Sequence, residues 1–107
     1  LEGVAMRVPT ANVSIVELIF NSKKDLSVNY INKAFIEASR KKLKGILEVT
    51  DQKLVSVDFN HNSHSAIIDA SLTSVVEKNM GKISAWYDNE WGFSNRMCDL
   101  VSYIHKI

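Results

Sequence analysis

The spacing of apolar residues changes repeatedly along this chain, and these changes restrict its fold more than any other feature. β-Branched and aromatic residues run together in Val13–Phe20, helical spacing holds from Ser27 to Lys42, and short extended runs follow. Helical spacing returns from Trp91 to His105. This order predicts an α+β fold: a mixed, largely antiparallel sheet with helices packed on it, ending in a C-terminal helix.

Two strands are expected before the first helix. Val4–Val8 is an incipient strand, and Val13–Phe20 is expected to be a strand covered on both faces, because both alternating sets are mostly apolar. Pro9 lies between them and cannot donate to a central ladder. Further strands are expected at Ile46–Thr50, Val55–Phe59, Ser65–Ala70, Thr73–Glu77 and Lys82–Asp88.

The charges of the chain are balanced. Thirteen Lys and Arg residues against twelve Asp and Glu residues give a net charge of +1, which argues against a nucleic-acid partner. The basic residues before Gly45 are instead attributed to the C-terminal turn of the first helix, where cations favour the helix dipole. Ser27 or Asp25 is expected to cap the other end of that helix.

The single cysteine and the short apolar runs indicate the cellular compartment in which the protein is expected. A single cysteine excludes a disulfide framework and a zinc site built from several thiolates. No apolar run is long enough to cross a membrane, so a cytoplasmic protein without a membrane partner is expected. Because the chain begins with Leu1 and enters an apolar segment at once, we expect it to be a piece of a longer protein.

Several familiar chemistries are weakly supported. Asp58, His61 and His64 have a spacing that a divalent metal could use, but loop histidines and an Asx turn explain them better, so no metal site is predicted. The dinucleotide and P-loop glycine patterns are absent, as is the GxSxG elbow of serine hydrolases. Cys98 is expected to act as a small hydrophobic residue on the last helix.

Arg7 is a candidate for anion binding. A guanidinium in an otherwise apolar, covered strand must find an anion or a carbonyl group. Two interpretations stay open on the residues alone: pairing with Glu17 or Asp58 within the chain, or contact with a bound phosphate or carboxylate.

The densest group of polar and aromatic residues lies at Tyr87–Arg96, where a strand meets a helix. The Asn89 amide offers both a donor and an acceptor, which suits a primary carboxamide or a base edge. The alternative is structural: Trp91 and Phe93 belong to the core, and Asp88 or Asn89 caps the helix.

These segments together resemble one known family. The motifs are AMRVPTANVS at residues 5–14, LKGIL at 43–47, VSVDFN at 55–60, HS at 64–65 and WYDNEWGFSNR at 86–96. In this order and spacing they resemble the C-terminal part of phosphorylating glyceraldehyde-3-phosphate dehydrogenase, bacterial type, and also the sister erythrose-4-phosphate dehydrogenases.

The resemblance implies roles for three residues. Arg7, in the RVPT motif, would bind a phosphate of the substrate, and Asn89, in YDNE, would hold the nicotinamide carboxamide of NAD. Phe93 would lie near the nicotinamide at a position that is often tyrosine in the family. The last helix would pack against a nucleotide-binding domain.

The resemblance also implies what this chain lacks. The catalytic cysteine and its activating histidine would lie upstream, so residues 1–107 would form the C-terminal part of the catalytic domain of a two-domain dehydrogenase and hold no catalytic residue. The whole enzyme would be a cytoplasmic homotetramer of glycolysis that converts glyceraldehyde 3-phosphate and inorganic phosphate to 1,3-bisphosphoglycerate with NAD. The fragment alone is expected to be inactive; the rival hypothesis is a non-catalytic binding or assembly module.

Overall fold

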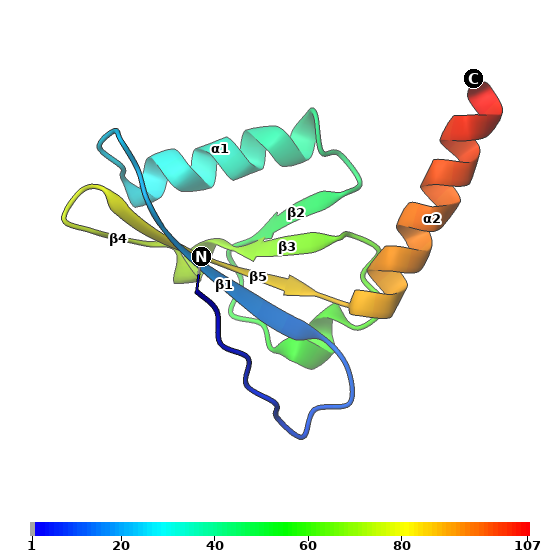
Figure 1. Cartoon of the computed structure of the whole chain (residues 1–107), viewed down its shortest axis with the longest axis horizontal. Helices are drawn as coiled ribbons and strands as arrows, with labels where there is room; N and C mark the ends of the chain where they lie inside the picture. The colour runs from blue at the N-terminus through cyan, green and yellow to red at the C-terminus, as the bar shows by residue number, and fades with distance from the viewer. Residues whose placement is uncertain (1) are drawn as a thin grey trace.

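Strand β5 (Met80–Tyr87) organises the five-stranded open sheet of the computed structural model, which describes residues 2–107 (Figure 1). It pairs antiparallel with β1, β3 and β4, whereas β2 and β3 run parallel, so the sheet is mixed and largely antiparallel. These strands are β1 (Ser14–Asn21), β2 (Leu47–Thr50), β3 (Ala66–Asp69) and β4 (Ser74–Val76). The α+β class and the strands near β2 to β5 are confirmed.

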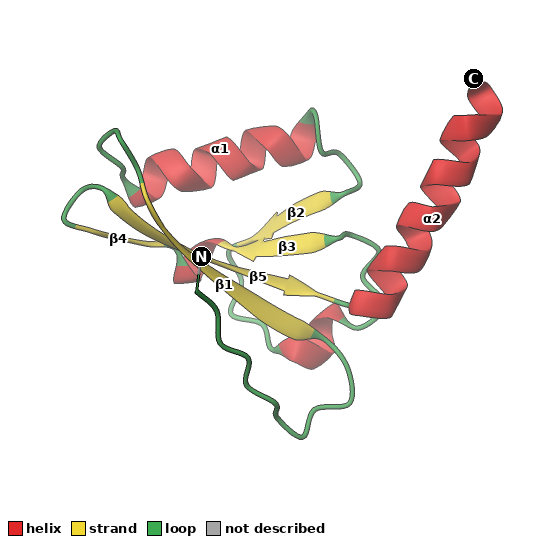
Figure 2. Cartoon of the chain, in the orientation of Figure 1, coloured by secondary structure: helices red, strands yellow, loops and turns green. Residues whose placement is uncertain are grey.

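Helix α1 (Val28–Arg40) lies across one side of the sheet, as Figure 2 shows. The core beneath it consists of Leu47, Ile68 and Ala85, with Phe35 and Ala38 of α1 packed against them. The Ser27 hydroxyl accepts the Tyr30 N–H at 3.1 Å, so the predicted N-cap is confirmed. The helix ends about two residues before the predicted Lys42, with Lys41 at its C-cap.

Two predicted strands are absent from the described residues. Val4–Val8 is irregular and exposed, since no strand of residues 2–107 pairs with it. The predicted strand at Val55–Phe59 is wrong, because Ser56–Phe59 forms a short 3₁₀ helix. The Asp58 carboxylate accepts the Val55 N–H at 2.8 Å and closes this turn, a local bond that β-propensity does not detect.

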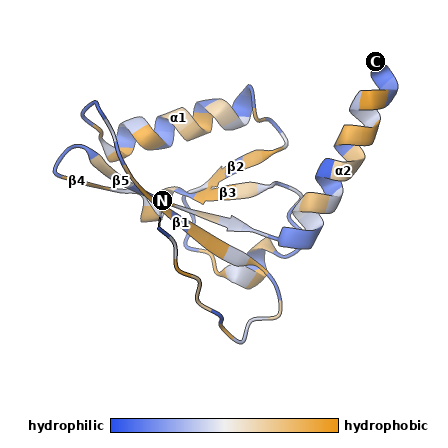
Figure 3. Cartoon of the chain, viewed as in Figure 1, coloured by the Kyte–Doolittle hydropathy of each residue, from blue (hydrophilic) through white to orange (hydrophobic). Residues whose placement is uncertain are grey.

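The prediction that Val13–Phe20 is covered on both faces is wrong for the described residues. All side chains of β1 are exposed except Phe20, which is half-buried, and Ile19 is 62% exposed. Figure 3 shows the resulting apolar strand at the edge of the sheet. The strand carries apolar side chains on both faces, but nothing within residues 2–107 covers these faces.

Helix α2 (Asn89–Lys106) begins at the end of β5 and projects away from the sheet (Figure 1). Most of its apolar side chains are exposed: Phe93, Met97, Leu100, Val101, Tyr103 and Ile104. Between residues 2 and 107, neither helix is apolar enough over a sufficient length to span a membrane.

Candidate functional site

The buried carboxylate of Asp88 joins three segments that are far apart in the sequence. It is 2% exposed, and its Oδ2 accepts the Asn12 Nδ2–H at 2.8 Å and the His61 N–H at 2.9 Å. Its Oδ1 accepts the Trp91 N–H at 3.1 Å. We call this group the Asp88 junction; it ties the segment before β1 and the loop after the 3₁₀ helix to the first turn of α2.

The register of the sheet places the junction. Ser14 at the start of β1 is paired with Tyr87 at the end of β5. In an antiparallel pair, the residues just before one strand and just after its neighbour meet at the same end, so Asn12 and Asp88 lie together. The other Asn12 amide hydrogen is donated to Asn60 Oδ1 at 2.7 Å, which adds a second link between the two loops.

Two strained backbone positions lie next to the junction. Val13 has φ 67° and His61 has φ 62°, in the left-handed region that a β-branched residue rarely adopts. Such conformations cost about 1–3 kcal/mol each and persist where the surroundings impose them. The bonds from Asn12, next to Val13, and from the His61 N–H to Asp88 lie directly at these positions.

The junction also holds Asp88 in its charged form. Burial raises the pKa of this carboxyl, but the His61 and Trp91 backbone N–H groups, the Asn12 amide and the charge of His61 lower it. The net effect is a pKa below the ordinary value of an aspartate. Asp88 is therefore a permanent acceptor at neutral pH.

Asn89 and Phe93 lie on the exposed surface of the first turns of α2. Asp88 is the N-cap of this helix, which confirms one of the two predicted caps, and Asn89 is its first residue. Phe93 follows four residues later on the same face and is 65% exposed. The expectation that Trp91 and Phe93 are core is wrong within residues 2–107, since Trp91 is 43% exposed and stacks on the His61 ring.

Arg7 lies on the irregular, exposed segment that precedes the junction, so its predicted position in a covered strand is wrong. Both carboxylates considered as partners are engaged elsewhere: Glu17 contacts Lys82 Nζ at 3.2 Å, and Asp58 accepts the Val55 N–H. None of the four ion pairs in residues 2–107 includes Arg7. Its binding of an external anion stays a prediction.

The three residues considered for a metal have separate partners. Asp58 caps the 3₁₀ helix, His61 stacks on Trp91, and the His64 ring Nδ1 lies 2.8 Å from Asn62 Oδ1. The His64 N–H also donates to Asn62 Oδ1 at 3.0 Å, so the predicted Asx turn is confirmed. No group of three metal-ligating side chains occurs in the described part of the chain.

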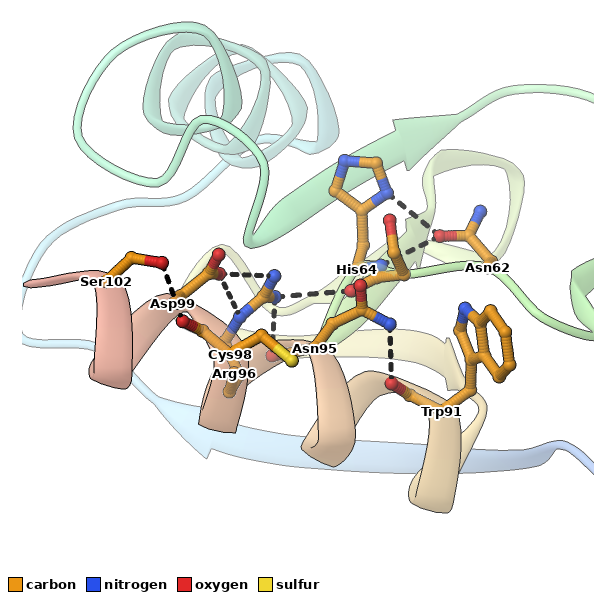
Figure 4. Close-up of polar contacts among 10 residues, drawn as sticks. Asn62, His64, Trp91, Asn95, Arg96, Cys98, Asp99 and Ser102 are labelled. Atoms are coloured by element: carbon orange, nitrogen blue, oxygen red, sulfur yellow. Dashed lines mark hydrogen bonds and ion pairs between the residues drawn. The ribbon is translucent and has the colours of Figure 1, made fainter.

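The first two turns of α2 are fastened to the loop around His64 (Figure 4). Arg96 Nη1 donates to the Ser63 carbonyl and to Ser65 Oγ, both at 3.2 Å, and its Nη2 contacts Asp99 Oδ2 at 2.8 Å. A Cβ on Gly92 would lie 3.1 Å from the His64 carbonyl, so the helix approaches this loop closely. Cys98 is exposed rather than packed as a small hydrophobic residue.

Sequence reasoning missed Asn12, Asn60 and Arg96 as parts of this site. Only the strand register reveals that Asn12 faces Asp88. Its place five residues after Arg7, in the same motif, was the available signal.

Comparison with known proteins identifies the family of this chain. Residues 1–89 match the model of the glyceraldehyde 3-phosphate dehydrogenase C-terminal domain. The chain therefore belongs to the glyceraldehyde-3-phosphate dehydrogenase family of oxidoreductases, which confirms the resemblance seen in its motifs.

Three relatives illustrate the similarity over 104 residues, or 97% of the chain. Glyceraldehyde-3-phosphate dehydrogenase 2 of Staphylococcus aureus strain MRSA252 is 53% identical, and that of Bacillus subtilis is 45% identical. A chloroplastic glyceraldehyde-3-phosphate dehydrogenase of Arabidopsis thaliana is 49% identical. The match covers 30%, 31% and 26% of these proteins, respectively, so the chain spans about a third of their length or less.

The lowered pKa of Asp88 predicts an acid-sensitive contribution to stability. Because the folded-state pKa lies below the unfolded value, the stabilisation is complete above the unfolded value and is lost as the pH falls through the folded one. We expect Asp88→Asn to lower the free energy of unfolding by about 1.5–3 kcal/mol at pH 7, the range for hydrogen bonds to charged groups. Urea denaturation of both proteins from pH 7 downwards measures this difference.

The difference in the free energy of unfolding between wild type and Asp88→Asn should become smaller below about pH 4, near the ordinary aspartate pKa. The exposed Asp51 provides the control, because Asp51→Asn should change little at any pH. If Asp88→Asn lowered the free energy of unfolding by the same amount over the whole pH range, the lowered pKa of Asp88 would be contradicted.

Proposed function

We propose that this chain is the C-terminal part of the catalytic domain of an NAD-dependent, phosphorylating glyceraldehyde-3-phosphate dehydrogenase. Within that enzyme it supplies Arg7 for the substrate phosphate, and Asn89 and Phe93 for the nicotinamide. The observation that carries this proposal is the Asp88 junction, which brings the Arg7-bearing motif and the Asn89-bearing motif to one end of the sheet.

The state of Arg7 supports a role in phosphate binding. Its side chain is exposed, and no described ion pair occupies it. A guanidinium offers a fork of donors that matches two phosphate oxygens, and such charge-assisted bonds are stronger than neutral ones. An arginine left without an internal carboxylate is available for this contact.

Asn89 and Phe93 fit a nicotinamide carboxamide and ring. The exposed Asn89 amide can donate to the carboxamide oxygen and accept from its NH₂ group. Phe93 presents an exposed ring one turn further along the same helix face. Bound NAD would supply the hydride acceptor. Phe93 has no hydroxyl, so it contributes packing and no hydrogen bond.

The nucleophile and the base of the reaction would belong to the remaining part of the enzyme. The proposed reaction is the glycolytic oxidation and phosphorylation of glyceraldehyde 3-phosphate to 1,3-bisphosphoglycerate by a homotetramer. The relatives in Staphylococcus aureus and Bacillus subtilis are glyceraldehyde-3-phosphate dehydrogenases, which supports this substrate. The fragment alone would bind parts of the substrate and the cofactor without turnover.

Replacing Arg7 by alanine should weaken substrate binding. In the intact enzyme, meaning the full-length protein that contains this chain, we expect Arg7→Ala to raise KM for the phosphorylated aldehyde by at least about tenfold, as loss of a charge-assisted contact does. Initial rates of NADH formation measure this. Arg40→Ala, which removes an exposed arginine at the end of α1, is the matched control and should leave KM unchanged. An unchanged KM for Arg7→Ala would refute the assignment.

Replacing Asn89 by alanine should weaken the binding of NAD and slow turnover. We expect Asn89→Ala in the intact enzyme to raise the Kd for NAD and to lower kcat, each by at least about fivefold, because the carboxamide loses its donor and acceptor. Calorimetric titration and turnover measure the two effects. Asn29→Ala, at an exposed asparagine of α1, should leave both unchanged. Normal NAD affinity together with normal turnover in Asn89→Ala would rule out the role.

A further inference from the structure

We infer that Asp88 is a positioning residue that aligns the phosphate-binding segment around Arg7 with the nicotinamide-binding start of α2, an inference that rests on the proposed function. Asp88 contacts neither ligand in this proposal. It acts through Asn12 on one side and through the first turn of α2 on the other.

The Arg7 segment, residues 2–13, needs such a support because few hydrogen bonds of its own hold it in place. Residues 2–13 form no strand or helix, and the bond from the Thr10 N–H to the Val8 carbonyl at 2.8 Å is a local turn around Pro9. Asn12 is the point at which this segment is fastened to the other two motifs, through Asp88 and Asn60. Losing the bond from Asn12 would let the Arg7 segment move relative to α2.

The nicotinamide side depends on the same carboxylate more directly. Asp88 immediately precedes Asn89, and its Oδ1 accepts the Trp91 N–H as the N-cap. A cap fixes where the helix begins and therefore the direction of its first residue. The Gly92 N–H adds a bond to the Asp88 carbonyl at 2.9 Å, so both the backbone and the side chain of Asp88 hold this turn.

Only a carboxylate meets the demands of the junction. The Asp88 carboxylate accepts hydrogen bonds from three N–H groups and donates none. A charged carboxylate can accept on both oxygens. An asparagine at this position would turn its NH₂ group toward at least one donor. The Asn12 amide and the His61 N–H share Oδ2, so a change at Asp88 disturbs two loops and the helix together.

The test separates the two sides of the junction in the intact enzyme. Asn12→Ala removes the bonds from the Arg7 segment to Asp88 and Asn60 and leaves the cap of α2 in place. It should therefore raise KM for the phosphorylated aldehyde by at least about fivefold and change the Kd for NAD by less than about twofold. Asp88→Asn should raise both constants by at least about fivefold. The double variant should raise KM by less than the product of the two single effects, because both variants lose the same bond between Asn12 and Asp88.

Two measurements distinguish positioning from a general loss of structure. All constants are taken at a temperature at which circular dichroism shows each variant folded, and NAD affinity is measured by calorimetry without turnover. Amide hydrogen exchange at His61 and Trp91 should accelerate in Asp88→Asn, since both N–H groups lose their carboxylate acceptor. If Asp88→Asn does not fold, Asn12→Ala still decides the substrate side.

Asp69 provides the matched control for a buried carboxylate. It is 3% exposed and accepts the Trp86 Nε1–H at 3.2 Å and the Ser71 hydroxyl at 2.6 Å. Asp69→Asn should lower the melting temperature and leave KM and the NAD Kd unchanged. If Asp88→Asn behaves in the same way, or if Asn12→Ala leaves KM unchanged, the positioning role is overturned while the proposed function stands. A wild-type enzyme without activity on the phosphorylated aldehyde and NAD would instead overturn the proposed function.

Discussion

The carboxylate of Asp88 is the interaction on which the geometry of this chain's functional end depends. It is buried, charged and bonded to donors from three segments, so it compensates its own desolvation through its partners. Removing the carboxylate would leave two backbone N–H groups and one hydrogen of the Asn12 amide without acceptors. It would also remove the bond of the His61 N–H and the bond of Asn12 next to Val13, the two positions with positive φ.

The sheet explains why this carboxylate can act as a fixed point. β5 is bonded to neighbours on both sides, and Ile67 and Ser84, in β3 and β5, are fully buried. Asp88 follows directly after β5, so the start of α2 takes its position from the best-packed part of the molecule. Arg96 then fixes the second turn to the loop around His64. The helix beyond that point extends away from the sheet with its apolar residues exposed.

The sequence predicted the elements that capping residues or apolar periodicity mark. The Ser27 cap with its amphipathic helix and the alternation that becomes β5 were both found, because capping and periodicity act over a few residues. The Asp58 bond that turns Val55–Phe59 into a 3₁₀ helix and the register that brings Asn12 to Asp88 were not found. Both depend on partners that propensity does not encode.

The apolar residues of β1 and α2 illustrate a different limit. Their apolar patterns indicate that these surfaces are covered, but the patterns do not identify the covering element. Within residues 2–107 the surfaces stay exposed. The proposal that the chain is the C-terminal part of a larger catalytic domain accounts for these surfaces, because the rest of the enzyme would cover them. Arg7 and Asn89, both exposed, would face the bound substrate and cofactor.

A chimera tests the central claim most directly. The present chain would replace the 30% of the Staphylococcus aureus relative that it matches at 53% identity, and the initial rate of NADH formation from glyceraldehyde 3-phosphate and phosphate would be measured. The account predicts a chimera with a rate within about tenfold of the relative, which corresponds to a change of no more than about 1.4 kcal/mol in the activation barrier. A chimera that folds like the relative, with the same circular dichroism spectrum, and forms no NADH would contradict it.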